Sequence, residues 1–284
     1  MPELPEVETV RQDLSRVLVG QKLSGMEVGR PRSLRHPDPS TAARWIEGGT
    51  VLGVGRVGKH LLIEVDRPTG DTDGRSLVVI HLGMSGQLWW LPSSTAAHRH
   101  AHVRIFGESA NELRFVDPRT FGWVAVARAA EVATVLPVLE RLGPDPLSGD
   151  FDATVLSRRI GHRQGRLKAL LMDQTVVSGL GNIYSDEVLH AAGLRWDRPA
   201  CSLDPREIVA LHDQIVRVLS DAVSCRGSSL ADSQYRDLYG LPGRFQERHR
   251  VYARAGKPCA RCGETIRKER FGGRSTFFCP SCQT

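Results

Sequence analysis

The chain has 284 residues, of which 40% are hydrophobic and 25% charged, with a formal net charge of +6. This length suits two or three domains with buried cores. The sequence contains no apolar run of 18 residues and no basic segment leading into an apolar stretch near Met1, so it predicts neither a membrane span nor a secretory signal. We therefore expect a cytoplasmic protein without a membrane partner, and the basic charge favours a polyanionic one.

The first residues, MPELPEVET, combine two prolines with three glutamates. One interpretation is structural: a proline starts a helix, and Glu3, Glu6 and Glu8 lie favourably at its positive end. The other is chemical, because removal of Met1 would leave Pro2 with a terminal secondary amine. An α-amino group has a pKa of roughly 7.7–8, so a useful fraction is unprotonated at neutral pH. Such an amine attacks an electrophilic carbon and passes to an iminium, and these residues alone leave both interpretations open.

The apolar spacing predicts an amphipathic helix over 6–18, and short β-rich runs follow Gly20. These runs cover 22–29, 50–57, 60–66, 76–82, 86–91, 101–106, 112–117 and 122–128. Their number and spacing predict an antiparallel β-sandwich. The stretch 66–76 has the composition of an exposed hairpin loop.

From residue 131 the pattern becomes helical, with periodic segments at 166–173, 183–192 and 206–224. Between the first two lies SGLGNIYSDE, in which Gly179 and Gly181 suit a tight turn. The polar, Gly-rich stretch 226–246 predicts a loop. The fold class is therefore α+β and multidomain, divided into an N-terminal catalytic domain (1–130), a linker (131–150), a helical domain (151–246) and a C-terminal module (247–284).

The C-terminal module has the cysteine spacing of a metal site. Cys259-x2-Cys262 and Cys279-x2-Cys282 are separated by 16 residues, which predicts a zinc site with four cysteine ligands. Two disulfides are the alternative, which a reducing cytoplasm disfavours. Four thiolate ligands leave no open position, so one Zn²⁺ ion would be structural. The intervening ETIRKERFGGRSTFFC predicts a β-hairpin with its turn at Gly272–Gly273.

Basic residues concentrate near this module. Four of them lie on the predicted hairpin: Arg267, Lys268, Arg270 and Arg274. The planar fork of arginine suits phosphate oxygens, so nucleic acid is the expected partner. A solvated basic tail and a protein-binding hairpin remain alternatives at this point.

Three motifs, MPELPEVET, SGLGNIYSDE and the paired CxxC hairpin, together resemble one family in content and order. The chain is similar over about residues 1–283 to the bacterial formamidopyrimidine-DNA glycosylases, kin to the endonuclease VIII enzymes. An opening PEL rather than PEG favours the former branch. The resemblance implies a helix–two-turns–helix element in the helical domain. It also implies a bifunctional DNA glycosylase/AP lyase of base-excision repair, which removes oxidised purines such as 8-oxoguanine and formamidopyrimidines and cuts the strand by β,δ-elimination.

The resemblance also implies catalytic roles. Pro2 would be the nucleophile at C1′, and Glu3 the acid/base that protonates the deoxyribose ring oxygen. Glu6 would hold the site together by accepting hydrogen bonds. Lys59 would contact the phosphate of the lesion nucleotide and assist elimination, and Arg274 would grip phosphate from the zinc hairpin.

Further DNA contacts are implied for several positions. His81 and Asn182 would contact phosphates, Met84 would fill the gap left by the extruded base, Arg119 would pair with the orphaned base, Phe121 would wedge the stack, and His100 would also contact DNA. Taken singly, Met84 and Phe121 would each be interpreted as core residues, although Met84 lies in a Gly-Met-Ser-Gly turn that suits a core poorly.

The chain departs from the family's lysine-rich pattern in RRIGHRQGRLKALLMDQ. An expected phosphate-contacting lysine falls near Gln164, which leaves Arg163, Arg166 or Lys168 for that role. The loop 226–246, which caps the flipped base in the family, has its own composition here, so the lesion preference is open.

The expected partner is double-stranded DNA carrying oxidised bases or abasic sites, bound by a monomer. One alternative is an enzyme for oxidised pyrimidines in the manner of endonuclease VIII. Another is a zinc-dependent protein that binds damaged DNA without chemistry. An RNA-binding protein is disfavoured because nothing resembles an aromatic RNA platform.

Overall fold

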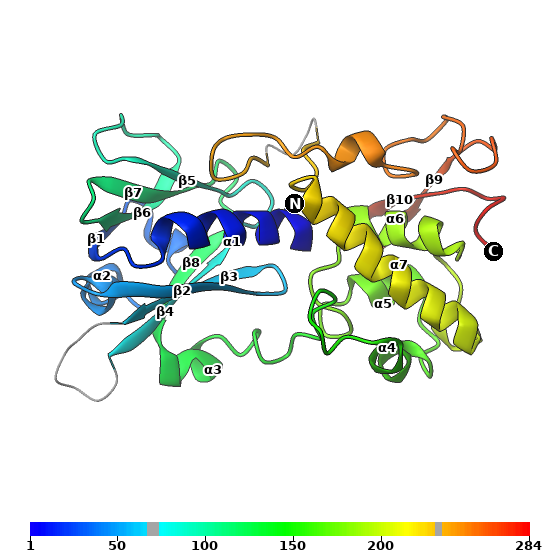
Figure 1. Cartoon of the computed structure of the whole chain (residues 1–284), viewed down its shortest axis with the longest axis horizontal. Coiled ribbons are helices and arrows are strands. Elements are labelled where there is room, and N and C mark those ends of the chain that lie inside the picture. The colour runs from blue at the N-terminus through cyan, green and yellow to red at the C-terminus, as the bar shows by residue number, and fades with distance from the viewer. Residues whose placement is uncertain (67–73, 231–234) are drawn as a thin grey trace. The chain divides into compact units, whose positions relative to one another are not determined.

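The computed structural model describes residues 1–66, 74–230 and 235–284. Most of the predicted loop 66–76 and the centre of the predicted loop 226–246 lie outside the described residues. The chain divides into two compact units (Figure 1). Unit 1 comprises Met1–Arg141 and Arg226–Gly243, and unit 2 comprises Leu142–Cys225 and Arg244–Thr284. None of the helices in the described ranges has the length and apolar character needed to cross a membrane.

Unit 1 begins with helix α1 (Leu4–Leu18), which starts two residues before the predicted helix. Its apolar stripe, which includes Val10 and Leu14, is buried, as the 3.6-residue period requires. The helix is followed by Gly20, whose φ of +82° turns the chain away. Figure 1 shows α1 alongside the strands of one sheet, and its contacts are with β2 and β3.

Two four-stranded antiparallel sheets form the described part of the sandwich. The first has the order β2 (Thr50–Val57), β3 (His60–Asp66), β4 (Arg75–His81) and β8 (Trp123–Arg128). The second has the order β1 (Leu23–Val28), β6 (Ala101–Gly107), β7 (Asn111–Val116) and β5 (Gln87–Pro92). Buried residues of both sheets and of α1 belong to one apolar core. The β-sandwich prediction is confirmed.

Shorter elements complete unit 1. They are the 3-10 turns η1 (Pro31–Ser33) and η2 (Ala129–Glu131) and the helices α2 (Pro39–Ile46) and α3 (Val132–Val135). The sequence patterns did not predict α2, which is capped by the Asp38 carboxylate accepting the N–H groups of Ser40 and Thr41.

Unit 2 is helical with a terminal hairpin. Its elements are α4 (Ala153–Ile160), α5 (Leu167–Met172), α6 (Asn182–Ala192), η3 (Ala200–Ser202), α7 (Pro205–Ser224), η4 (Phe245–Arg248), β9 (Arg267–Phe271) and β10 (Arg274–Phe278). Helix α6 is buried along most of its length and packs against α5 and α7. A capping box of Asp204 and Glu207 starts α7. Helices α5, α6 and α7 follow the predicted segments closely, because the capping residues and the glycine turn are readable locally, whereas α4 was not predicted.

Residues 142–150 and 247–284 lie in the same unit as most of the predicted helical domain 151–246, whereas one segment of that domain does not. Residues 226–243, here called the capping segment, belong to unit 1. Tyr235 and Leu238 are part of the unit 1 core, and this burial explains the assignment. The remaining domain boundaries stay predictions.

Candidate active site and nucleic-acid interface

Helix α1 begins at a buried, acidic N-terminus. Glu3 is the N-cap residue, and Pro5 lies in the first turn, where its missing N–H costs nothing. The N–H of the peptide between Pro2 and Glu3 donates to Oε2 of Glu6 at 2.8 Å. Glu3 and Glu6 are 2% and 1% exposed, and Pro2 is also buried. Glu6 therefore fixes the peptide from which the Pro2 ring and the Glu3 side chain extend.

The other oxygen of Glu6 holds the capping segment. Glu6 Oε1 accepts the N–H of Ser228 at 2.7 Å. The adjacent Gly227 has a φ of +76°, and a Cβ there would lie 2.5 Å from Glu6 Oε1. Glycine is needed at 227 both for its conformation and for this close approach. Glu6 thus joins the start of α1 to a segment more than two hundred residues later.

Gly227→Ala is expected to lower the melting temperature by several degrees. The left-handed conformation costs a non-glycine residue about 1–2 kcal/mol, and the new methyl group would displace the Glu6 carboxylate as well. Gly240→Ala is the matched control, because Gly240 has a φ of +78° and no atom within 4 Å of its ideal Cβ. Thermal unfolding of both variants measures the difference. Equal decreases would mean that the contact with Glu6 contributes nothing.

Arg226 makes two ion pairs, one with α1 and one within the capping segment. Its guanidinium bridges Asp13 of α1 and Asp237, whose side chains are fully buried. The other oxygen of Asp237 accepts the N–H groups of Tyr239 at 3.0 Å and Leu241 at 2.8 Å. Arg226 has a φ of +61°, uncommon for a residue with a side chain. The ion pairs with the two buried carboxylates stabilise Arg226 in this backbone conformation.

The turn between β2 and β3 places Lys59 beside two histidines. Lys59 is 6% exposed. His60 and His81 are partners across β3 and β4, and their ring centroids lie 4.9 Å apart. Burial lowers the pKa of His60 to about 4 and that of His81 to about 3, and the charges of Lys59 and Arg35 act the same way. The N–H of Gly83 donates to His81 Nδ1 at 3.2 Å, so the neutral ring carries its proton on Nε2.

These shifts predict that the protein loses stability in mild acid. Both folded pKa values lie below the unfolded value of 6.5, so the unfolded state takes up protons first as the pH falls. The contribution is complete above pH 6.5 and is lost toward pH 3–4, at up to about 1.4 kcal/mol per pH unit for each histidine.

His81→Asn is therefore expected to flatten the plot of melting temperature against pH below 6.5. His162→Asn, at an exposed histidine, should leave the slope as in the wild type. An unchanged slope in His81→Asn would contradict the prediction.

Two neighbouring loops of unit 1 present exposed apolar side chains. Met84, in the β4–β5 turn, is 37% exposed, and Phe121, in the β7–β8 loop, is 55% exposed. The loops touch at Gly83, where a Cβ would lie 2.4 Å from the nitrogen of Gly122. The Arg119 guanidinium lies over the Phe121 ring, 5.2 Å from its centroid. Exposed apolar groups held on packed loops are typical of an interaction site.

Asp117 joins the same loops, although the sequence patterns did not single it out. Its fully buried carboxylate accepts hydrogen bonds from the Ser85 hydroxyl at 2.5 Å and from the Gly122 N–H at 2.7 Å. It also accepts the N–H of Arg119 at 3.3 Å, and its own N–H donates to the carbonyl of His100 at 3.0 Å. The available signal was the Asp-Pro pair in DPRTFG, since aspartate at the start of a turn accepts N–H groups of the residues that follow.

In unit 2, Asn182 is the first residue of α6 and follows the N-cap residue Gly181. Gln174 fixes the preceding turn: its Oε1 accepts the N–H of Gly179 at 2.9 Å, and its Nε2 donates to the Leu180 carbonyl at 2.8 Å. A helix N-terminus offers unpaired N–H groups and a positive partial charge. The position of Asn182 therefore suits a phosphate contact.

The prediction for Lys168 needs correction. Lys168 is 1% exposed, and its Nζ lies 2.7 Å from Asp186 Oδ1 and 3.0 Å from Thr276 Oγ1. Burial raises the pKa of Asp186, while the Lys168 charge opposes that shift. The ammonium thus joins α5, α6 and the hairpin rather than facing a phosphate. Half-buried Arg163 and exposed Arg166 remain candidates for that contact.

Four cysteines converge at the base of the β9–β10 hairpin. Their Sγ atoms all lie within 4.8 Å of one another, with Cys259–Cys282 at 3.9 Å and Cys262–Cys279 at 3.5 Å. Tetrahedral coordination with Zn–S bonds of about 2.3 Å separates the sulfurs by about 3.8 Å, whereas a disulfide requires about 2.05 Å. The residues fit one structural zinc ion rather than two disulfides, as predicted.

The hairpin carries Arg274 exposed at the start of β10. The turn before it is formed by Gly272 and Gly273, with φ of +54° and +76°. This pair of left-handed residues produces a two-residue hairpin turn, so the turn lies where it was predicted.

Three family models match successive parts of the chain. The formamidopyrimidine-DNA glycosylase N-terminal domain matches residues 1–124, the H2TH domain of the same enzymes matches 142–234, and the zinc finger found in FPG and IleRS matches 256–284. A formamidopyrimidine-DNA glycosylase of Laribacter hongkongensis is 43% identical over 284 residues, covering 100% of both chains. The chain belongs to the formamidopyrimidine-DNA glycosylase family.

Solved structures of this family agree with the assignment. A complex between the Lactococcus lactis Fpg and DNA containing an abasic site has a TM-score of 0.87 and 32% identity, covering 99% of each chain. The wild-type L. lactis Fpg with DNA containing an oxidised pyrimidine has a TM-score of 0.87 and 33% identity, covering 100% of each chain. The resemblance inferred from the motifs is confirmed.

The predicted residues lie in two groups, one in each unit. Unit 1 contains Pro2, Glu3, Glu6, Lys59, His81, Met84, His100, Arg119 and Phe121. Unit 2 contains Arg163, Asn182, Arg274 and the four cysteines. Within unit 1, Pro2, Glu3 and Glu6 are one hydrogen-bonded group, and Met84, Arg119 and Phe121 lie on the two loops that Asp117 joins. The individual catalytic and DNA-contacting roles stay predictions.

Proposed function

We propose that this family member is a bifunctional DNA glycosylase/AP lyase of base-excision repair, acting on oxidised purines such as 8-oxoguanine and formamidopyrimidines in double-stranded DNA. The observation that carries the proposal is the buried group at the start of α1. Glu6 holds the peptide N–H between Pro2 and Glu3 at 2.8 Å. A secondary amine and a carboxylate on adjacent, fixed residues are what attack at an acetal-like carbon requires.

The reaction begins once Met1 is removed. The Pro2 nitrogen forms a bond to C1′, and the base leaves with the electron pair of the glycosidic bond. Glu3 protonates O4′ as the sugar ring opens, and loss of the proton on nitrogen gives the iminium. Loss of a C2′ proton then breaks the C3′–O3′ bond, and a second elimination breaks the C5′–O5′ bond. Lys59 contacts the phosphate of the lesion nucleotide and assists these eliminations.

The loops that carry Met84, Arg119 and Phe121 suit a duplex from which one base must be extruded. A base in a duplex is reached only after extrusion, at a cost of a few kcal/mol. Met84, Arg119 and Phe121 would fill the resulting gap and offset that cost. Asn182 and Arg274 would hold phosphates, and the chain would act as a monomer. In this scheme Asp117 acts by positioning the loops rather than by touching DNA.

Borohydride trapping tests the proposal. Wild-type protein and Pro2→Gly are incubated with a duplex carrying one 8-oxoguanine opposite cytosine, and covalent complexes are resolved by electrophoresis. We expect a wild-type band that is lost or strongly weakened in Pro2→Gly. Mass spectrometry of the N-terminus establishes that Met1 is absent from the reacting protein.

The other outcomes separate the alternatives. A covalent band with a thymine-glycol duplex but not with the 8-oxoguanine duplex would support the proposed Schiff-base mechanism. It would also show that the enzyme prefers oxidised pyrimidines. No band on either lesion or on an abasic duplex would leave a damage-binding protein without chemistry.

A further inference from the structure

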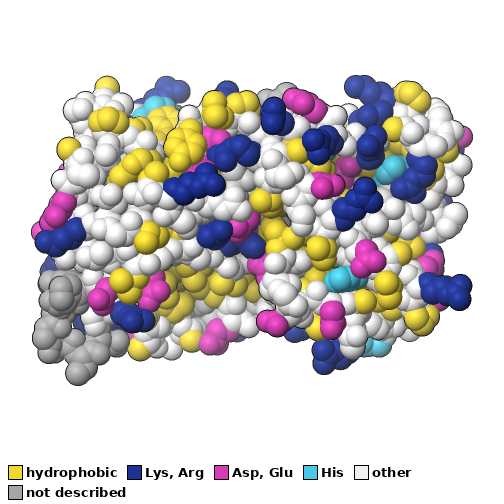
Figure 2. Space-filling model, in the orientation of Figure 1, with side chains coloured by type: hydrophobic (Ala, Val, Ile, Leu, Met, Phe, Trp, Pro, Cys, Tyr) yellow, Lys and Arg dark blue, Asp and Glu magenta, His cyan; other side chains and the backbone are white. Residues whose placement is uncertain are grey.

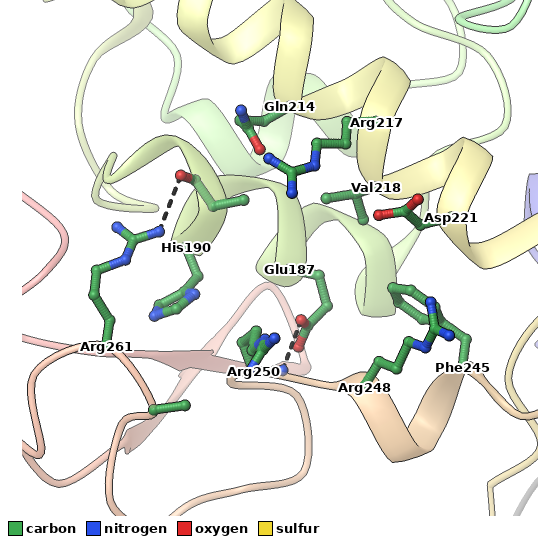
Figure 3. A pocket seen from close by; sticks show the side chains of 12 residues that line it. Glu187, His190, Gln214, Arg217, Val218, Asp221, Phe245, Arg248, Arg250 and Arg261 are labelled. Atoms are coloured by element: carbon green, nitrogen blue, oxygen red, sulfur yellow. Dashed lines mark hydrogen bonds between the residues drawn. The ribbon is translucent and has the colours of Figure 1, made fainter. Parts of the chain in front are cut away.

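Unit 2 contains a concave site that includes none of the predicted DNA-contacting residues. A pocket of about 650 Å³ lies among α6, α7 and residues 245–261 (Figure 3). This volume falls in the usual range of small-molecule sites. Val218 of α7 and Phe245 of η4 supply part of an apolar wall.

Four arginines from separate segments line the pocket: Arg217, Arg248, Arg250 and Arg261. All four are exposed, and Figure 2 shows basic side chains gathered over this part of the unit. The Arg261 guanidinium donates to the Ala191 carbonyl at 3.1 Å, which anchors it on α6.

Two carboxylates also line the pocket, against four arginines. The Glu187 carboxylate is already hydrogen-bonded to the backbone, because it accepts the N–H groups of Arg250, Val251 and Tyr252 at 2.8–3.0 Å. Asp221, on α7, is the other. The excess of guanidinium groups favours an anionic ligand with several oxygens, which arginine binds in a bidentate manner.

His190 adds a requirement for a hydrogen-bond donor in the ligand. Its side chain lines the pocket and is 3% exposed. Nε2 lies 3.4 Å from Sγ of Cys259, a geometry in which an N–H at Nε2 donates a hydrogen bond to the sulfur. Nδ1 is then an acceptor, and it is buried without a hydrogen-bond partner among the described residues. Such an atom calls for a ligand that also donates a hydrogen bond.

We propose that this pocket binds a nucleotide. Its phosphate groups pair with Arg217, Arg248 and Arg250, and a hydroxyl or amino group of its sugar or base donates to His190 Nδ1. An inorganic phosphate can meet the second requirement only by turning a protonated oxygen away from the arginines. A free nucleotide and the terminal nucleotide of a nucleic-acid strand offer the same chemistry. The inference uses no residue of the proposed base-excision reaction and does not rest on it.

Isothermal titration calorimetry on the full-length, zinc-loaded protein tests the site. The probes are dATP, tripolyphosphate and 5′-phosphorylated hexathymidine. The pocket variant is Arg217→Gln/Arg248→Gln, and the control is Arg206→Gln, which removes an exposed charge from the same helix outside the pocket. We expect one site per chain, weakened at least tenfold in the pocket variant and within twofold of wild type in the control.

The three probes identify the ligand. dATP should bind more tightly than tripolyphosphate, because its hydroxyl and amino groups can donate to His190 while its phosphates stay paired with the arginines. Tighter binding of hexathymidine than of dATP would identify a strand terminus, and the reverse order a free nucleotide. Either order supports the site.

Several results would overturn the inference. They are the absence of saturable binding, equal weakening by Arg206→Gln, undiminished binding by the pocket variant, and displacement of dATP by hexaglutamate at equal concentration, which would identify an acidic peptide site. Circular dichroism and zinc content of the pocket variant establish that it is folded.

Discussion

Glu3→Gln is expected to lower the single-turnover rate of base excision by about 10²–10⁴-fold, the range typical of a positioned general acid. Glu3 is 2% exposed at the N-cap of α1, so its carboxyl group lies in a fixed place beside the proposed nucleophile. Glutamine keeps its volume but cannot transfer a proton to O4′. The measurement is rapid-quench excision of 8-oxoguanine with enzyme in excess over duplex.

Binding of the same duplex separates chemistry from structure. Fluorescence anisotropy should give a dissociation constant within about twofold of the wild type, because the substitution removes no proposed DNA contact. The melting temperature should also change little, since the hydrogen bond between the Glu3 N–H and Glu6 uses the backbone of residue 3. An excision rate within threefold of the wild type would exclude Glu3 as the acid.

Cys279→Ser is expected to abolish zinc binding and to unfold the C-terminal hairpin. The apolar cluster beneath the metal site contains only a few buried side chains among the described residues, including Val251, Ile266 and Phe277. So small a core does not offset the entropy of ordering the hairpin, and the metal supplies the missing free energy. Unfolding of the hairpin would remove the predicted phosphate contact of Arg274. If other phosphate contacts of the hairpin are lost with it, DNA binding should weaken by about 10²-fold.

Cys201→Ser is the matched control, because Cys201 is an exposed free cysteine outside the cluster. Zinc content by mass spectrometry and hydrogen exchange over residues 259–283 report the two expected losses. Protected amides in β9 and β10 of Cys279→Ser would contradict the proposed dependence on metal, as would one zinc ion retained per chain.

Local patterns were sufficient for most of the fold. The runs 50–57 and 60–66 coincide with β2 and β3 end to end, because alternating side chains mark a strand. Two segments were read less well. The helix α2 was missed because its capping residues, Pro37 to Ser40, look like a turn. The helical pattern was expected to begin at residue 131, yet within 132–143 only Val132–Val135 is a helix, because Pro137 disfavours helical conformation at the residue before it.

The candidate site was predictable where its contacts are local. The bond from the Glu3 N–H to Glu6 spans one helical turn and follows from the spacing of PELPE. The contact between Ser228 and Glu6 spans 222 residues, and no local pattern encodes it. Lys168 was misassigned for the same reason, since its burial depends on Asp186 and on Thr276, 108 residues away.

The capping segment makes unit 1 discontinuous in sequence, because its last eighteen residues come from Arg226–Gly243. A polypeptide ending at Arg141 would lack the guanidinium that pairs with Asp13 and the N–H that binds Glu6. Buried carboxylates deprived of their partners cost several kcal/mol. Unit 1 is therefore not expected to be stable as the contiguous fragment 1–141. A fragment that preserves every contact of unit 1 must extend through residue 243, which means that residues 142–225 of unit 2 have to be synthesised before unit 1 is complete.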